Sequence, residues 1–598
     1  MSEQRYGEGA HGGHHELPFW KRYIFSTDHK TIGLQYGITS LLFLLFGFGL
    51  IMMMRFALAY PASQWETDPP PALLKAIMIA LGKIFTVPEG AITEEGVMDP
   101  GFYNTLGAMH GTIMVFLGVV PLLVGAFGNY VLPLQIGAKD MAFPKINMAS
   151  YWIYLAGGII MVASFWVQGG AANSGWTSYP PLAVTATTGQ TYWIIGMVCL
   201  ITSSLLGALN FLTTTIQLRA PGMSFFRLPF FVWAQFVTAF LLLLAFPPLE
   251  AAGILQLMDR VAGTSFFMPS GLVVSGEAVA HTGGGNPLLW QHLFWFLAHP
   301  EVYVLILPAM GIVAEIIAAN TRKPLWGYRM LVGSLIFLGF MSFIVWAHHM
   351  YMTGMGTAIS AFFQATTMII SIPSVVILTC LILSLYGASM RINTPMLFAL
   401  AFLPMFAIGG LTGLPLGLST SDIYLHDTYY VIGHFHYVVA PGTIFGIFAG
   451  IYHWFPKITG RKMNETLGKV HFWSSFVTIN GVFMPMLITG MAGMLRRGYD
   501  PTVYESNEPV LGLVKMISWS AWLLGVSQIP FIINFIMTIF GGLKVTSDNP
   551  WEATTLEWAT PTPPPHGNFR EPVAVYREPY EYSVPGRPTD FWPQNLPA

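Results

Sequence analysis

Charged residues are scarce in this chain of 598 residues. Asp, Glu, Lys and Arg together make up only 9% of the sequence, against roughly 25% in a typical soluble domain. A water-soluble protein of this length could not cover its surface with so few charges, and 54% of the residues are apolar. The net charge of −2 also offers no basic surface to a nucleic acid. The composition therefore favours a protein whose solvent is lipid.

Cysteine is also nearly absent. Cys199 and Cys380 both lie inside apolar runs, which excludes a disulfide framework and a zinc site built on paired thiolates. A secretory signal is missing as well, because residues 1–20 have no apolar core. The polar start MSEQRYGEGAHGGHHE predicts a cytoplasmic N-terminal tail over residues 1–32.

The chain does contain a series of long apolar runs. A helix needs about 20 apolar residues to cross a bilayer. Twelve such runs are centred near residues 43, 120, 158, 202, 240, 303, 337, 371, 406, 442, 480 and 527. The runs around 228–247 and 396–408 lack the polar stripe that a surface helix of a soluble protein carries. We therefore expect an all-α polytopic membrane protein, with a bundle of twelve transmembrane helices over residues 33–542.

The distribution of Lys and Arg predicts the orientation in the membrane. With the N-terminus inside, 20 of these residues fall in inner segments and 7 in outer segments, as the accumulation of basic residues on the cytoplasmic side requires. Both termini are thus expected to be cytoplasmic, with the protein in a bacterial cytoplasmic (inner) membrane. Residues 56–104 form an outer loop with a short helix at 73–86. The Pro-rich residues 543–598 form a cytoplasmic tail, extended across the inner face or a partner subunit.

Several histidines lie where lipid should be. A single buried histidine is more often a satisfied core residue than a ligand, but six at similar depth on four predicted helices do not fit that interpretation, because polar groups in lipid are costly and usually functional. These histidines, all in the outer half of the bilayer, are His110, His299, His348, His349, His434 and His436.

The spacing of these histidines indicates metal ligation, since imidazole binds both haem iron and copper. His434 and His436 are about 200° apart on a helix, so that one helix can hold a haem on each flank. His110 could provide the second axial ligand of one of these haems, leaving the other with an open position for a gas. The adjacent His348 and His349, with His299, can form a three-nitrogen copper site that faces this open position.

The segments around these histidines resemble the motifs of haem-copper oxidase catalytic subunits. The resemblance covers roughly residues 20–545 and is closest to the A-type branch, the cytochrome c oxidase catalytic subunit (subunit I). The segments that carry it are WFLAHPEVY at 295–303, HHMYMTG at 348–354, HDTYYVIGHFHYV at 426–438, HGTIMVF at 110–116, GNYVLPLQIGAKDMAFPKIN at 128–147, GWTSYPPLA at 175–183 and GMLRRGYD at 493–500.

The resemblance assigns the cofactors. His110 and His436 would hold a low-spin haem, and His434 would be the proximal ligand of a high-spin haem. His299, His348 and His349 would bind the active-site copper. Tyr303, one helical turn after His299, corresponds to the family tyrosine that is covalently joined to that histidine. Arg55 matches the arginine that contacts the formyl group of the low-spin haem, which implies haem a and haem a3.

Other matches imply a proton path and a magnesium site. Glu301 points away from the copper, and an ionisable side chain at that depth is typical of a proton relay. It resembles the family glutamate that ends a path from the inner surface. Asp140 matches the aspartate at the entrance of that path, and Asn129 and Asn147 match the asparagines of its mouth.

At the outer surface, Arg496 and Arg497 would pair with haem propionates, although arginines that flank a span are also common anchors. His426 and Asp427 match the magnesium ligands of the family, although a plain polar helix start has the same composition.

The eighth apolar run departs from the family pattern. Ile377 stands where a lysine usually begins a second proton route, Ser374 replaces a threonine, and Gln364 is also unusual. FMPMLITG at 483–490 replaces the expected glutamine-histidine pair. The only acid-bearing route traced in the sequence leads from Asp140 to Glu301.

The function expected is four-electron reduction of O₂ to water with proton translocation. Electrons would come from a c-type cytochrome through a dicopper centre on a separate oxidase subunit. Three alternatives remain open. A nitric oxide reductase is favoured by the missing lysine but disfavoured by Tyr303, a quinol oxidase differs only in its donor, and a non-catalytic haem-binding membrane subunit needs no copper site.

Overall fold

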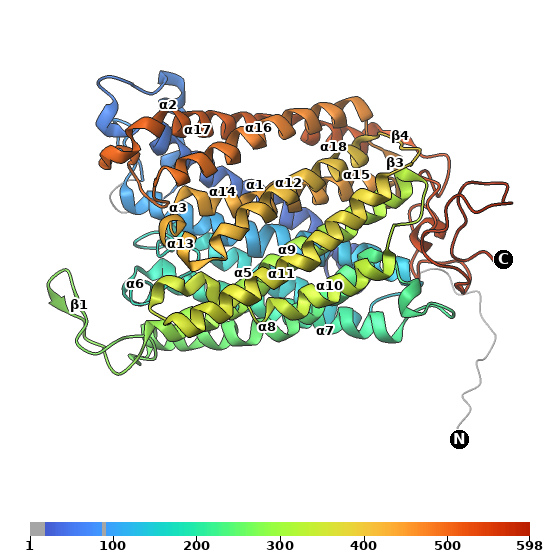
Figure 1. The fold of residues 1–598 in the computed structure, drawn as a ribbon, viewed down its shortest axis with the longest axis horizontal. Coiled ribbons are helices and arrows are strands. Elements are labelled where there is room, and N and C mark those ends of the chain that lie inside the picture. Colours follow the sequence, from blue (N-terminus) through green and yellow to red (C-terminus); the bar gives the residue numbers. More distant parts are fainter. Residues whose placement is uncertain (1–17, 86–90, 598) are drawn as a thin grey trace.

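The computed structural model describes residues 18–85 and 91–597, so residues 1–17 of the predicted N-terminal tail lie outside the described residues. Twelve helical segments are long and apolar enough to cross a membrane, which confirms the expected fold class. They run side by side as one bundle (Figure 1). The segments are His29–Gln64, Pro100–Ile136, Pro144–Trp166, Thr188–Gln217, Phe230–Val261, Pro287–Thr321, Tyr328–Thr353, Thr357–Leu385, Thr394–Leu416, Tyr429–Thr459, Glu465–Met491 and Glu505–Gly541.

Eight spans are built mainly on one α-helix each. These helices are α1 (His29–Ala59), α5 (Pro144–Ala163), α7 (Thr188–Gln217), α8 (Phe230–Val261), α9 (Pro287–Thr321), α11 (Thr357–Leu385), α12 (Thr394–Leu416) and α16 (Glu465–Met491). Outside the spans lie the short elements α2 (Ala72–Gly82), α6 (Leu182–Thr185), α13 (Ser419–Leu425) and the antiparallel pairs β1 (Val273–Val274) with β2 (Glu277–Ala278) and β3 (Arg461–Lys462) with β4 (Leu543–Lys544). The expected helix at 73–86 is α2, in the part of the outer loop that the structure describes.

The other four spans change their helical type along their length. The second joins α3 (Pro100–Thr112) to α4 (Asn129–Ile136) through the π-helical segments Ile113–Val119 and Pro121–Gly128. The tenth joins α14 (Tyr429–Tyr437) to α15 (Phe445–Thr459) through a π-helical segment that contains Pro441. The seventh continues α10 (Tyr328–Ser342) into a 3₁₀ segment, Trp346–Thr353, and the twelfth consists mainly of α17 (Leu511–Val526) and α18 (Ile529–Gly541). Irregular turns of this kind often occur at functional sites.

Polar side chains mark the beginnings of several spans. The Asp28 carboxylate accepts a hydrogen bond from the Lys30 backbone N–H (2.8 Å), and Asn393 and Asn464 cap α12 and α16 in the same way. Such caps satisfy backbone donors that the first helical turn leaves free. The long apolar sequences can therefore start and stop at defined residues.

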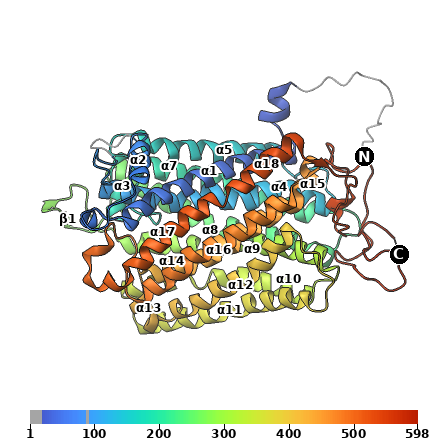
Figure 2. The same cartoon turned by 90° about the horizontal axis from the view of Figure 1, so that it is seen from above.

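The C-terminal segment, residues 542–597, covers one end of the bundle, beside β3 and the described N-terminal residues (Figure 2). Its contacts reach, among others, the first, tenth and sixth spans. Asn568 bonds to the His29 ring (3.0 Å), the Trp551 indole donates to the His453 carbonyl (2.8 Å), and the Tyr580 hydroxyl donates to Glu315 (2.7 Å). The tail therefore extends across its own bundle, one of the two placements expected from the sequence.

Arg322 fastens this tail to the end of α9. It donates hydrogen bonds to the carbonyls of Trp551 (3.2 Å) and Glu552 (2.8 Å) and to both carboxylate oxygens of Asp590. The arginine is buried, so its charge would be costly without these acceptors.

We predict that Arg322→Met loosens the tail by about 2 kcal/mol or more, because hydrogen bonds to charged groups contribute roughly 1.5–3 kcal/mol each. Limited proteolysis of the detergent-solubilised protein should then cut the tail faster than in the wild type. Arg391→Met is the matched control, because Arg391 pairs with Glu552 at a half-exposed position, where an ion pair contributes roughly 0–1 kcal/mol. Equal cleavage rates for the two variants would contradict the prediction.

Candidate metal centre

A large internal cavity of about 1480 Å³ lies in the bundle. All six histidines singled out in the sequence line it, together with Arg55, Glu301, Tyr303, Arg496 and Arg497. The spans therefore bring these side chains together as their depth in the sequence predicts. Apart from these groups, the wall is mainly apolar, which suits a large, flat, largely apolar ligand.

Three histidines converge at one point of this cavity. One nitrogen from each of His299, His348 and His349 lies within 4.8 Å of the others, and His299 Nδ1 is 3.2 Å from His349 Nε2. His299 comes from α9, whereas the other two are adjacent in the 3₁₀ segment that ends the seventh span. Three imidazole nitrogens at this spacing are a suitable donor set for copper.

Neighbouring side chains hold these rings in place. The His349 ring stacks on Trp295, with centroids 3.8 Å apart, and His348 Nδ1 is 2.9 Å from the Thr367 hydroxyl. Tyr303 lies one turn after His299 on α9, with its hydroxyl 3.2 Å from His299 Nε2. Contacts that fix ligand orientation in this way are typical of metal sites.

His110, His434 and His436 share a different arrangement. In each ring, Nδ1 lies 2.8–2.9 Å from a backbone carbonyl, of Gly47, Gly409 and Ile432 respectively. No hydrogen bond to Nε2 of these rings is present among the described residues. An Nδ1–H that donates to a carbonyl fixes the tautomer and leaves the Nε2 lone pair free for a metal.

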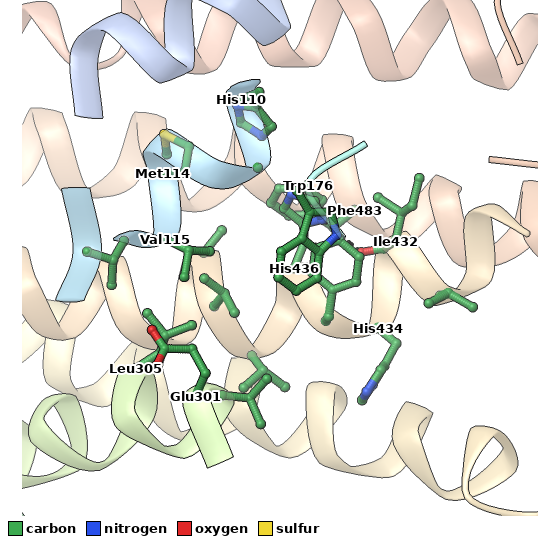
Figure 3. A pocket seen from close by; sticks show the side chains of 18 of the residues that line it. His110, Met114, Val115, Trp176, Glu301, Leu305, Ile432, His434, His436 and Phe483 are labelled. Carbon is green, nitrogen blue, oxygen red and sulfur yellow. Dashed lines mark hydrogen bonds between the residues drawn. The ribbon is translucent and has the colours of Figure 1, made fainter. Parts of the chain in front are cut away.

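His434 and His436 leave α14 in different directions (Figure 3). The His436 ring stacks on Phe483, with centroids 4.7 Å apart. The segment that departs from the family pattern at 483–490 therefore begins with a residue that supports one of these histidines. On the other side of α14, a Cβ at Gly413 would lie 2.7 Å from Cε1 of His434, so only glycine leaves room for this ring against α12.

Arg55 indicates that the cavity has an acceptor-bearing ligand. Its side chain is buried, its Nη1 has no hydrogen-bond partner in the described part of the chain, and the guanidinium lies 5.7 Å from the centre of the Tyr429 ring. A buried, unpaired arginine is costly, so its position in the cavity wall favours a ligand with an oxygen acceptor. The free Nε2 atoms, the apolar wall and this arginine together fit haem.

Charged groups gather at the rim of the cavity. Arg496 donates to the Asp427 carboxylate (Nη2–Oδ1 2.5 Å). Burial alone would raise the pKa of Asp427, but the Arg496 guanidinium prevails and lowers it. His426 lies between Asp422 (3.5 Å) and Asp427 (3.6 Å), and its hydrogen bond to Asp422 raises the pKa of the imidazole. The structure thus pairs Arg496 and Asp427 with each other, whereas Arg497 lies beside them without an ion pair among the described residues.

The acidic residues of the expected proton path lie in two different places. Glu301 is buried beside the cavity, and neither of its carboxylate oxygens has a hydrogen-bond partner within residues 18–85 and 91–597. It lies near Leu305 in Figure 3. Asp140 follows α4 at the tail-covered end, where its carboxylate accepts the Met141 N–H (2.7 Å). Burial raises the pKa of Asp140.

A small polar cavity of about 40 Å³ lies beyond Asn129, and sequence reasoning did not find it. Its wall includes Tyr36, Ser150 and Ser203, with the Tyr36 hydroxyl donating to Ser150 (3.1 Å). This volume holds about three waters. The oxygen of Asn129 and both polar atoms of Asn147 are buried without partners. The hydroxyls come from three spans that are far apart in the sequence. The one feature of the sequence that could have indicated this cavity is the presence of hydroxyl residues within apolar runs.

The unusual residues of α11 have different positions. Ile377 is buried among apolar side chains and Ser374 lines the large cavity. Gln364 does not line it, and its side-chain oxygen accepts the backbone N–H of Ser419 (3.1 Å) at the start of α13. Gln364 thus makes a local structural contact that is independent of the metal site.

Comparisons with known proteins agree with this geometry. The family model described as "Cytochrome C and Quinol oxidase polypeptide I" matches residues 31–523. The chain is 40% identical to the alternative cytochrome c oxidase subunit 1 of Bradyrhizobium diazoefficiens, over 98% of this chain and 94% of that one. It is also 40% identical to cytochrome c oxidase subunit 1 of Cereibacter sphaeroides, over 94% and 97%.

A cryo-EM structure described as a heme-copper terminal oxidase dimer has the same fold. It matches with a TM-score of 0.66 and 20% identity, over 86% of this chain and 85% of that one. This chain therefore belongs to the subunit I family of the haem-copper terminal oxidases, multi-pass membrane proteins that carry haem and copper.

Proposed function

We propose that this chain reduces O₂ to water in its histidine-lined cavity and couples the reaction to proton translocation. The observation that carries this proposal is the Tyr303 hydroxyl beside His299, within the three-histidine cluster. O₂ reduction needs four electrons and four protons, and a phenol in this position can provide one of each. Electrons would arrive from a c-type cytochrome through a dicopper centre on a partner subunit.

The proposal gives each group of residues a separate task. His110 and His436 would hold the low-spin haem, His434 the high-spin haem, and the His299 cluster the copper. When bound, these haems and the copper would supply the redox chemistry and the O₂-binding position. The chain itself orients its imidazoles through backbone carbonyls, keeps the cavity wall apolar, and holds a transferable proton on Tyr303 and on Glu301.

Protons would enter at Asp140 and reach Glu301 through the small cavity next to Asn129. Its wall of hydroxyls can keep a short chain of waters, and a buried carboxyl without a cationic partner retains its proton until it is needed. We further propose that both termini are cytoplasmic in a bacterial inner membrane. Arg55 would contact a formyl group, which favours haem a and haem a3, and His426 with Asp427 would bind magnesium once Arg496 turns toward a haem propionate.

The second candidate function is nitric oxide reduction, which one observation favours: α11 has no Asp, Glu, Lys, Arg or His that could begin a proton route to the cavity. A quinol donor would change the partner and leave the cavity as it is. A non-catalytic haem subunit has no use for three copper-competent histidines.

The purified oxidase complex should consume O₂ with reduced cytochrome c and turn over NO at least about tenfold more slowly. Side-by-side oxygen- and NO-electrode measurements test this. Rapid NO consumption with negligible O₂ uptake would overturn the proposal in favour of the reductase.

Replacing His436 with leucine should abolish the low-spin haem signal and leave carbon monoxide binding intact, because His434 belongs to the other side of α14. Optical spectra of the reduced variant, with and without carbon monoxide, report both haems separately. A normal low-spin spectrum would refute the assignment of His436.

Glu301→Gln should slow turnover by about 10²-fold, since the change keeps the size of the side chain and removes its transferable proton. Metal and haem contents should stay at wild-type values. Asp140→Asn should show the same loss, because it removes the acid at the entrance of the same path. Wild-type turnover and proton release by either variant would mean that protons travel elsewhere.

A further inference from the structure

Two more glutamates are buried at the tail-covered end of the bundle. Glu315 lies on α9 and is 3% exposed, whereas Glu557 belongs to the C-terminal segment and is 1% exposed. One aromatic contact connects them: the Phe231 N–H donates to Glu315, the Phe231 ring is 5.4 Å from the Trp454 ring, and the Trp454 indole N–H is 3.5 Å from Glu557 Oε1. The sequence does contain a signal for Glu315, an ionisable residue within the sixth span, but its partner Glu557 is 242 residues away in a tail whose position the sequence leaves open.

The two side chains differ in their hydrogen bonds. Glu315 accepts from the Phe231 N–H (3.1 Å) and the Tyr580 hydroxyl (2.7 Å). Glu557 accepts from the amide of Gln135 (3.0 Å) through one oxygen, and its other oxygen is buried without a partner. If these residues served only to fasten the tail, hydrogen-bond acceptors would be enough, and a glutamine side chain also provides one. Such a role would not explain why one buried carboxylate oxygen is left without a hydrogen bond.

Neither carboxyl group makes a direct ion pair in the described part of the chain, although Lys457 interacts electrostatically with Glu557 from beyond ion-pair distance. No ion pair among the described residues includes Glu315 or Glu557. Lys457 donates instead to Thr560 (2.7 Å) and Thr562 (2.8 Å), and Arg322 is bound to Asp590.

The remaining titratable groups packed around the pair are Tyr328 on α10, His453 on α15, and Tyr580 and Tyr582 of the tail. None of them is a permanent cation, and burial raises the pKa of Glu557. Because neither carboxyl has a cation in direct contact among the described residues, ionising both would be costly, and at least one proton stays on the pair.

The pair lies between the aqueous end and the metal-site cavity. On the aqueous side, the Tyr580 ring is 6.1 Å from Tyr328, and Glu578, two residues before Tyr580, is exposed. On the other side, the cavity wall reaches Met310 on α9 and Ser374 on α11. Glu315 is five residues past Met310, which is about 7.5 Å along a helix. This gap requires only two or three transient waters.

We propose that Glu315 and Glu557 form a proton-storing carboxyl pair that supplies protons to the Tyr303 side of the cavity, in place of an ionisable residue on α11. In each cycle the Glu315 O–H bond breaks as the proton leaves toward the cavity. The bond re-forms when the Tyr580 hydroxyl passes on its proton and regains one from the aqueous side. No electron moves in these steps. The inference rests on the proposed function, because O₂ reduction consumes the protons.

The test is anaerobic reduction of the complete oxidase complex, followed by stopped-flow absorbance and by infrared difference spectra. Glu315→Gln should slow reduction of the high-spin haem at least about tenfold, leave the low-spin haem at its normal rate, and remove a carboxyl C=O band from the difference spectrum. Tyr580→Phe, which removes only the hydroxyl, should slow the same step.

Glu250→Gln is the matched control. Glu250 is a glutamate within the span of α8 whose carboxylate accepts from Thr202 (2.6 Å), away from both cavities, and its replacement should change neither readout. If Glu315→Gln shows a normal rate of haem reduction and an unchanged infrared spectrum, the pair only fastens the tail and supplies no protons.

The wild-type infrared spectrum keeps the inference testable even if Glu315→Gln fails to assemble. The proposal requires a carboxyl C=O band that changes when the haems are reduced and that is still present in the Glu301→Gln variant. If no such band is found, the proposed proton-storing pair is wrong. Failure of the proposed function looks different: the wild type would then not consume O₂, whatever its infrared spectrum shows.

Discussion

The constraint on which the site depends is that the largely apolar interior of the bundle offers little water to satisfy polar groups. Each imidazole must find its partners in the protein or in a ligand. In His110, His434 and His436, a backbone carbonyl satisfies one of the two ring nitrogens, Nδ1. The other nitrogen of each ring then remains free in an apolar cavity, where a metal is the natural acceptor of its lone pair. The same carbonyls therefore stabilise the fold and prepare the ligands.

Irregular backbone accompanies these ligands. The π-helical segment after α3 begins three residues beyond His110, and another begins two residues beyond His436. His348 and His349 lie in 3₁₀ backbone, next to the non-helical Met350. One nitrogen of each of these adjacent rings nevertheless lies within 4.8 Å of the other and of His299. The irregularity is tolerated because it lines a cavity inside the protein rather than facing lipid.

Sequence reasoning could predict the twelve spans and the convergence of the histidines, because both follow from local patterns: runs of about 20 apolar residues and offsets of one, two or four positions. Contacts between distant segments were beyond it. The stacking of Phe483 on His436 and the hydroxyls near Asn129 join residues from separate spans, and the ion pair of Arg496 with Asp427 joins two separate loops. Gln364 attracted attention by its rarity, although its contact is a helix cap. The charge distribution could assign the tail to one face of the membrane. Its position on the bundle depends on contacts with Arg322 and Glu315, which the composition of the sequence does not predict.

The buried glutamates of α9 show how surroundings distinguish identical side chains. Glu301 has no hydrogen-bond partner for either oxygen among the described residues, so nothing in the protein holds its carboxyl in one orientation. In the proposed function, this carboxyl would turn between the side of the small cavity and the side of the metal-site cavity. Glu315, fourteen residues further on, is held in one orientation by the Phe231 N–H and the Tyr580 hydroxyl. Movement suits a relay that must separate two water-filled spaces, whereas a fixed position suits a store that is refilled from one side. As proposed, one helix would carry both kinds of acid, whereas α11 beside it has no Asp, Glu, Lys, Arg or His.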